Sequence, residues 1–145
     1  MSQSLPSAGR ALTVLHVDDD PMNLRVVEEI LSAFGHNAVK ASSGQEALAH
    51  LARQAFDVVL MDIHMPGMGG IEAVERLRTS DGPSRDTPVI ALTADIVSRR
   101  PEEYLGLGFT AFVAKPILVS GLINAILLAA KCETNEARRR VNRRA

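Results

Sequence analysis

The alternation of short apolar runs with amphipathic stretches is the feature that most constrains how this chain can fold. Five runs are rich in aliphatic and β-branched residues, as strands are: Leu12–Val17, Ala38–Ala41, Val58–Met61, Val89–Leu92 and Ala111–Ala114. Between and after these runs, apolar residues recur at helical spacing. Strands that alternate with helices form a parallel sheet with helices on both faces. We therefore predict one α/β domain, with a doubly wound, five-stranded parallel sheet and five helices.

Local signals predict both ends of the first helix and the start of the second. Asp20 precedes Pro21, a pair typical of an N-cap and the first helical residue. Gly35 is a stop signal for the first helix. Ser43, followed three residues later by Glu46, predicts a capping box at the start of the second helix.

The fourth helix is expected between about Ser98 and Leu107. Pro101 falls inside this stretch, and proline is tolerated in a first turn but not in a helix interior. We therefore expect this helix to begin late, near Arg100, and to leave Asp95–Arg99 as a loop.

The fifth helix is expected from about Ser120 to at least Lys131. Its apolar residues cover a broad face: Leu118, Leu122, Ile123, Ile126, Leu127 and Ala130. Part of this face should pack on the sheet, and an exposed remainder is typical of a partner site. We expect either a homodimer through the face formed by the fourth helix, fifth strand and fifth helix, or a wholly buried helix.

The composition excludes several classes of protein. The single cysteine among 145 residues excludes a disulfide framework and a cysteine-based zinc site. No apolar run reaches the ~18 residues of a membrane span, and the first ten residues lack the apolar core of a signal peptide. We expect a cytoplasmic protein with a disordered segment at 1–10, a folded domain at 11–131 and a basic tail at 132–145.

Charge is unevenly distributed along the chain. Residues 131–145 hold six basic and two acidic residues, a balance of +4, so the net charge of −1 leaves −5 on the first 130 residues. Basic runs can bind nucleic acid. The alternative function is therefore a nucleic-acid-binding regulator that acts through this Arg-rich tail. The run is short and lacks aromatic residues, so a solvated tail is expected rather than one that binds nucleic acid.

Polar residues follow four of the predicted strands, where parallel sheets place their ligand sites. Asp18, Asp19 and Asp20 follow the first strand. Asp62 follows the third strand, Thr93 the fourth, and Lys115 and Pro116 the fifth. Neighbouring carboxylates stay ionised only if a cation neutralises them, and oxygen ligands with open water positions suit Mg²⁺. A lysine and a hydroxyl suit phosphoryl oxygens, and one carboxylate can become an aspartyl-phosphate.

Four segments, VLHVDDDPMN, VVLMDIHMPGMGG, ALTA and FVAKPI, in this order and spacing, resemble the receiver domain of bacterial response regulators and hybrid histidine kinases. The resemblance covers roughly Leu12 to Ala130. It implies the flavodoxin-like strand order 2-1-3-4-5 and a signalling domain that catalyses only its own phosphorylation and dephosphorylation. The DDDPMN and QEALAHL segments look closer to hybrid-kinase receivers, but a stand-alone regulator is left open.

The resemblance also implies roles for individual residues. Asp62 would be the phosphoacceptor and would bind Mg²⁺ together with Asp19. Asp18 would hold a metal-bound water, and the backbone carbonyl of His64 would complete the protein ligands. Asp20 is not a usual ligand.

A second group of residues would read and report the phosphoryl group. Lys115 would contact it, ahead of a cis peptide to Pro116. Thr93 would be the switch hydroxyl, and Phe112 occupies the aromatic switch position. The donor would be a phosphohistidine on a sensor histidine kinase or a histidine phosphotransfer protein.

Several other histidines and methionines are given structural interpretations. His16 is interpreted as a core histidine with satisfied hydrogen bonds, and His36 as a loop residue. Met61 should fill the core, while Met65 and Met68 shape the following loop. An aspartyl-phosphate phosphatase on a similar sheet is disfavoured, because the third-strand aspartate has no equivalent role there.

Overall fold

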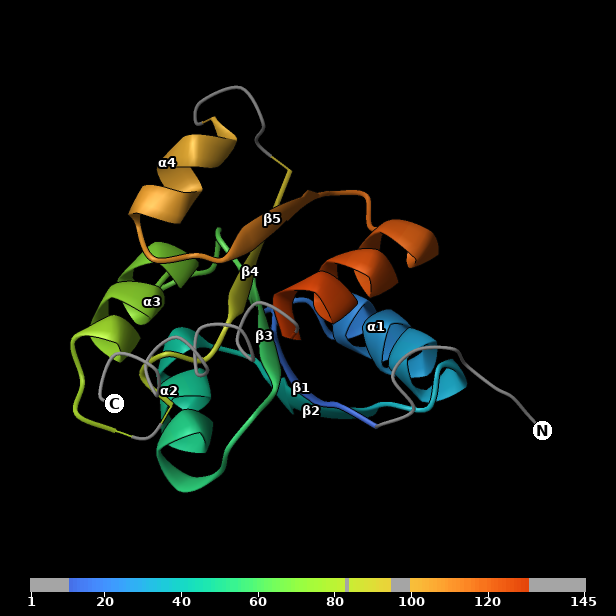
Figure 1. Ribbon diagram of the computed structural model, residues 1–145, viewed down its shortest axis with the longest axis horizontal. Coiled ribbons are helices and arrows are strands. Elements are labelled where there is room, and N and C mark those ends of the chain that lie inside the picture. The colour runs from blue at the N-terminus through green and yellow to red at the C-terminus, as the bar shows by residue number, and fades with distance from the viewer. Residues whose placement is uncertain (1–10, 83, 95–99, 131–145) are drawn as a thin grey trace, which may run out of the picture.

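Five parallel strands form one sheet in the order β2-β1-β3-β4-β5 in the computed structural model, which describes residues 11–82, 84–94 and 100–130 (Figure 1). The strands are β1 (Thr13–Val17), β2 (Asn37–Ala41), β3 (Val58–Asp62), β4 (Val89–Thr93) and β5 (Ala111–Ala114). The predicted strand order and direction are confirmed. Since β1 and β3 are neighbours although 40 residues of chain lie between their last and first residues, their carboxyl ends meet at the middle of the sheet.

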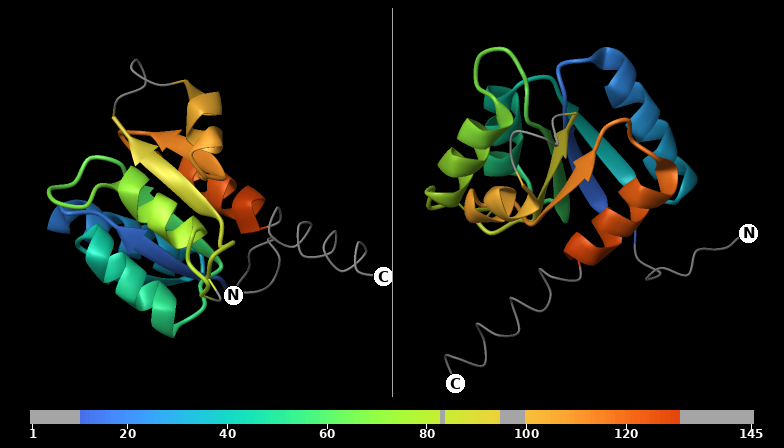
Figure 2. Two further views of the ribbon diagram at one scale, coloured as in Figure 1. Left: turned by 90° about the vertical axis from the view of Figure 1, so that its left-hand side faces the viewer. Right: turned by 90° about the horizontal axis from the view of Figure 1, so that it is seen from above.

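Helices cover both faces of the sheet, as predicted. They are α1 (Pro21–Ala33), α2 (Gly44–Arg53), α3 (Gly70–Arg78) and α4 (Pro101–Gly106), followed by a helix at residues 119–130, called here the C-terminal helix. Helix α1 and the C-terminal helix lie on one face, and α2, α3 and α4 lie on the other (Figures 1 and 2). The predicted extension of the C-terminal helix to Lys131 lies outside the described residues.

The sheet separates two hydrophobic cores. Alternate residues of a strand point to opposite faces, so Val59 and Met61 join the core on the α2–α3 side, while Val58 and Leu60 join the core on the α1 side. Strands β3 and β4 are buried along their whole length. Burial on both faces explains why their sequences are continuous apolar runs rather than alternating ones.

The predicted helix starts are largely confirmed. Asp20 Oδ1 accepts a hydrogen bond from Met22 N at 3.0 Å, ahead of Pro21 as the first helical residue. Ser43 Oγ accepts from Glu46 N at 3.1 Å. The capping box is incomplete, however, because the Glu46 carboxylate accepts instead from the backbone N and hydroxyl of Ser42.

Helix α4 begins late, as predicted from its proline. Pro101 is its first residue, and Arg100 is the N-cap, whose backbone N donates to Glu103 Oε1 at 2.7 Å. A proline at this position loses no helical hydrogen bond. The predicted loop at 95–99 lies outside the described residues.

His36 lies between α1 and β2, as predicted, but its side chain is buried. Its Nδ1 accepts a hydrogen bond from Leu12 N at 3.1 Å, which joins the start of β1 to the end of the α1 connection. Burial lowers the pKa of His36, against a smaller opposing effect from Asp57. The neutral ring is therefore the form that fits the fold.

Arg78 binds two connections at the amino edge of the sheet, a role that no sequence pattern indicated. Its guanidinium donates to the carbonyls of Gly108, Arg85 and Thr87 at distances of 2.7–3.0 Å. These carbonyls belong to the segments before β5 and β4. One side chain thus holds the end of α3 to the entries of two strands.

We predict that Arg78→Met destabilises the protein by about 2–3 kcal/mol, because charged donors to partly buried carbonyls are lost. Urea unfolding at pH 7.5 measures the change. The matched control is Arg76→Met, which removes an exposed ion pair to Glu72 at 2.8 Å and should cost less than about 0.5 kcal/mol. Equal losses in the two variants would contradict the role of Arg78.

We also predict that His36 makes folding stability depend on pH. Because its folded pKa is lowered, the unfolded chain binds the proton more tightly, so stability is complete above the ordinary pKa and falls as pH decreases below about 6.5. Between pH 7.5 and 5.5 its share should stay below about 1.4 kcal/mol. His36→Asn keeps an acceptor near Leu12 N but does not titrate. Urea unfolding should show a shallower pH slope for this variant than for the wild type, and identical slopes would contradict the prediction.

Candidate functional site

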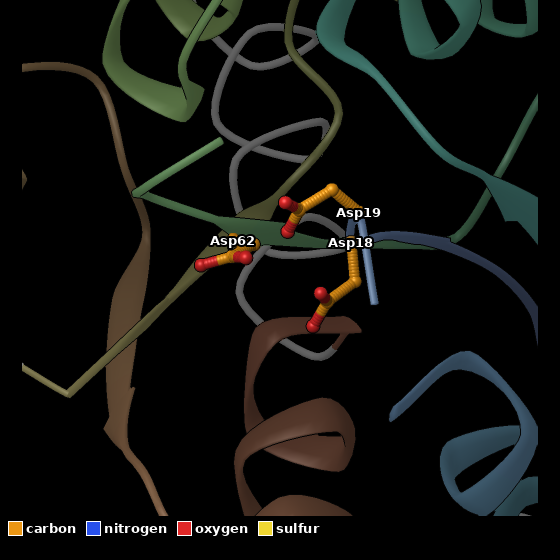
Figure 3. Close-up of side chains that lie close together, drawn as sticks. All are labelled: Asp18, Asp19 and Asp62. Atoms are coloured by element: carbon orange, nitrogen blue, oxygen red, sulfur yellow. The ribbon is translucent and has the colours of Figure 1, made fainter. Parts of the chain in front are cut away.

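Three carboxylates converge where β1 and β3 end (Figure 3). Asp18 and Asp19 directly follow β1, and Asp62 is the last residue of β3. One ligand oxygen from each lies within 4.8 Å of the others. Asp18 and Asp62 are buried, whereas Asp19 is exposed. The acidic cluster predicted from the strand ends therefore forms, with one member open to solvent.

Lys115 places a positive charge against this cluster. Its Nζ lies 3.4 Å from Asp62 Oδ1 and 3.5 Å from Asp18 Oδ2. Lys115 follows β5, and its backbone N donates to Thr93 O at 2.8 Å, which fixes the segment to the end of β4. The predicted cis peptide between Lys115 and Pro116 is confirmed.

The charges of the cluster do not balance, because three carboxylates face one ammonium group. Burial and the charge of Asp18 raise the pKa of Asp62, and Lys115 offsets these effects only in part. Ionised Asp62 is therefore electrostatically unfavourable in the protein alone. A cation bound at these oxygens would relieve the repulsion.

Besides Lys115, a backbone amide and the side chain of Asn23 hold Asp18 in place. Its Oδ1 accepts from Asp20 N at 2.9 Å, and its Oδ2 accepts from Asn23 Nδ2 at 3.3 Å. Asn23 is the last residue of the DDDPMN segment, but sequence reasoning assigned it no role of its own. Asp20 is exposed and caps α1, and that it is not a ligand stays a prediction.

His16 lies fully buried in β1, two residues before Asp18. The predicted satisfied hydrogen bonds are wrong: among the described residues neither ring nitrogen has a partner. The Asp18 carboxylate is close, but its Oδ2 lies 3.9 Å from His16 Nε2, beyond hydrogen-bond distance. Burial lowers the pKa of His16 to about 4, so the ring is neutral.

The predicted residues after β3 and at the end of β4 also lie at this edge. His64 N donates to Asp62 Oδ1 at 3.3 Å, while the residue itself is exposed. Thr93 is the last residue of β4 and is fully buried. Both lie at the carboxyl edge of the sheet, Thr93 as expected from its place after a strand and His64 as the family resemblance implies.

Phe112, the predicted aromatic switch residue, is half-buried in β5. Its ring stacks on Tyr104 of α4, with centroids 5.8 Å apart and planes at 16°. Tyr104 also contacts Phe109 edge to face at 5.9 Å. The sequence did not indicate Tyr104, which joins α4 to β5 directly.

Helix α3 begins immediately behind Asp62. A Cβ added at Gly70 would clash with the Asp62 carbonyl oxygen and lie 2.9 Å from Met61 Cγ. Met61 fills the core, as predicted. Met65 and Met68 do more than shape the loop, because both are buried in the core on the α2–α3 side.

Comparison with known proteins assigns the chain to a family. The family model of the response regulator receiver domain matches residues 14–127, so the chain belongs to the response regulator receiver domains. The signal transduction histidine-protein kinase BarA of Shigella flexneri is 38% identical over 117 residues, which are 81% of this chain and 13% of that protein. The sensor protein GacS of Pseudomonas syringae is 36% identical over 124 residues, which are 84% of this chain and 14% of that protein.

Solved structures agree with this assignment. The receiver domain of a sensor histidine kinase from Pseudomonas aeruginosa, with a magnesium ion coordinated in its active-site cleft, has a TM-score of 0.76 at 29% identity and covers 84% of this chain and 99% of that one. The chemotaxis protein CheY4 of Vibrio cholerae has a TM-score of 0.75 at 29% identity, and the match covers 83% of this chain and 99% of that one.

The chain spans only 13–14% of the length of these curated kinase relatives. It corresponds to their receiver part, and this agrees with the predicted closeness to hybrid-kinase receivers. No helix within residues 11–82, 84–94 and 100–130 is long and apolar enough to cross a membrane. Neither the family nor these relatives support the nucleic-acid alternative, and the Arg-rich tail lies outside the described residues.

We predict that Asp62→Asn makes the protein about 1 kcal/mol more stable in EDTA. The raised pKa of Asp62 means that its ionisation opposes folding at neutral pH, and the amide removes that charge while keeping an oxygen for His64 N. Saturating MgCl₂ should stabilise the wild type more than the variant and remove the difference. Urea unfolding measures both conditions.

Asp20→Asn is the matched control for this prediction. It removes a nearby exposed carboxylate, but asparagine caps helices as well as aspartate does, so stability should change little in EDTA. An Asp62→Asn protein that is less stable than the wild type in EDTA would contradict the electrostatic argument.

Proposed function

We propose that this receiver domain takes a phosphoryl group from a phosphohistidine donor onto Asp62 and signals through changed protein–protein contacts. The supporting observation is the geometry around Asp62: a buried carboxylate with Lys115 Nζ at 3.4 Å and two more carboxylates within 4.8 Å. This arrangement combines a nucleophilic oxygen with charges suited to a phosphoryl group.

In the proposed transfer, an Asp62 oxygen attacks the donor phosphorus. The P–N bond of the phosphohistidine breaks as the O–P bond forms, and the donor imidazole regains a proton. Lys115 contacts the phosphoryl oxygens that gain charge in the transition state. The Thr93 hydroxyl is the group that would move toward a phosphoryl oxygen afterwards.

The residues present fit a magnesium ion. The acidic cluster offers only oxygen ligands and carries excess negative charge, which is the chemistry that Mg²⁺ selects. Asp19 and Asp62 would bind it directly, Asp18 would bind through water, and the His64 carbonyl would complete the protein ligands. When bound, the ion supplies charge neutralisation and orientation for the phosphoryl oxygens.

The proposed signal passes from Thr93 to the face of α4 and β5. Phosphorylation would favour a conformation already sampled, in which Thr93 and Phe112 move together. The stacking of Phe112 on Tyr104 supports this route, because a displaced Phe112 ring would alter the packing of α4.

The proposed donor is a sensor histidine kinase or a histidine phosphotransfer protein, because the relatives are histidine kinases. The homodimer stays a prediction. A groove of about 490 Å³ between β5 and the C-terminal helix, lined in part by Phe112 and the exposed Leu128, gives it a candidate surface. The cytoplasmic location, the domain limits at 11–131 and the absence of any other enzymatic activity also stay predictions.

Phosphorylation of the wild type by a small-molecule phosphodonor in MgCl₂ tests the proposed function. Intact-mass spectrometry should show a labile adduct of one phosphate, and the adduct should be lost in EDTA. Asp62→Asn should form none. The Asp20→Asn control should form it as the wild type does, because Asp20 caps α1 and lies outside the acidic cluster.

Two outcomes would remove this proposal. One is a wild type that binds Mg²⁺ but accepts no phosphate from either the small-molecule donor or a phosphorylated histidine phosphotransfer protein. The other is an adduct that persists in Asp62→Asn.

A further inference from the structure

His16 is a buried polar group that the proposed reaction does not use. Its neighbours in β1 are Leu15 and Val17, and an aliphatic residue would fill its place without polar cost. Instead the imidazole is 99% buried, with both nitrogens unpartnered among the described residues. Buried polar groups without partners are costly and uncommon in folded proteins, so a partner available in another state is expected.

The position of His16 points to Asp18 as that partner. Residues two apart in a strand share a face, and Val14 of the same face packs in the α1-side core. The 3.9 Å between His16 Nε2 and Asp18 Oδ2 is too long for a hydrogen bond. It is also short for a bridging water, which separates its two partners by ~4.5 Å. A relative shift of about 1 Å would make the contact direct.

The present donors to Asp18 Oδ2 are weak and one of them is shared. Asn23 Nδ2 lies at 3.3 Å and Lys115 Nζ at 3.5 Å, near the limit for hydrogen bonds. Lys115 is also 3.4 Å from Asp62 Oδ1. A phosphoryl group on Asp62 would carry a charge of about −2 and would draw Lys115 toward it. Buried Asp18 would then lose one of its donors.

We propose that His16 is a positioning residue that donates its Nε2–H to Asp18 when Lys115 engages the phosphoryl group on Asp62. The inference rests on the proposed function and deepens it. His16 keeps the Asp18 carboxylate oriented toward the metal-bound water while the charge of the site changes. An aliphatic residue at position 16 would leave Asp18 with only Asn23 and its backbone donor.

Two substitutions at position 16 separate hydrogen bonding from packing. His16→Val removes the donor and also removes two unpartnered polar atoms, so the free protein should be as stable as the wild type or more stable. His16→Gln carries a donor near the position of Nε2. Val14→Ala is the matched control, because it loosens the same face of β1 without touching Asp18.

The readout is the dissociation constant for MgCl₂, measured by calorimetry with and without beryllium fluoride as the phosphoryl mimic on Asp62. In the presence of the mimic, His16→Val should bind Mg²⁺ about tenfold more weakly, a loss typical of groups that orient metal ligands. Without the mimic the loss should be smaller. His16→Gln should restore most of the affinity, and Val14→Ala should lower urea stability without changing the dissociation constant.

The inference is overturned if His16→Val binds Mg²⁺ as the wild type does in both states. It is also overturned if His16→Gln is as impaired as His16→Val, which would indicate ring packing alone. A wild type that binds no Mg²⁺ and forms no Asp62 adduct would remove the proposed function together with this inference. A functional wild type with indifferent His16 variants would remove the inference alone.

Discussion

Repulsion among carboxylates at the carboxyl edge of the sheet is the constraint on which the rest of the site depends. Asp18 and Asp62 are buried side by side because β1 and β3 are neighbours. Lys115 neutralises their negative charge only in part. The two cores on either side of the sheet supply the stability that tolerates this arrangement. A site of this kind is poised to respond to any change in its charge.

The sheet and the acidic cluster could be predicted from the sequence because both follow from local patterns. Each strand is visible in the sequence as a short run rich in aliphatic and β-branched residues. A parallel sheet brings the residues after its strands to one edge. Asp62 and Lys115 could thus be placed near each other although 53 positions separate them. The late start of α4 was predictable for a similar reason, since Pro101 restricts the backbone at its own position.

The features that escaped prediction depend on contacts across the chain. The residues next to Arg78 in the sequence do not indicate that its guanidinium binds the carbonyls of Gly108 and Thr87, because these carbonyls belong to connections later in the chain. Tyr104 looks like an ordinary helix residue until β5 brings Phe112 against it. His16 was assigned satisfied hydrogen bonds on the general behaviour of core histidines, and only the three-dimensional structure shows that its nitrogens face no partner in the described residues.

The close approach of α3 to Asp62 has a consequence for how this protein can evolve. The backbone at Gly70 lies so near the Asp62 carbonyl that a single added carbon would collide with it. Exposed positions on the same helix tolerate many residue types, whereas at position 70 only glycine fits without a shift of the backbone. Any lineage that replaces this glycine must first shift the start of α3 away from the end of β3, which carries the candidate acceptor.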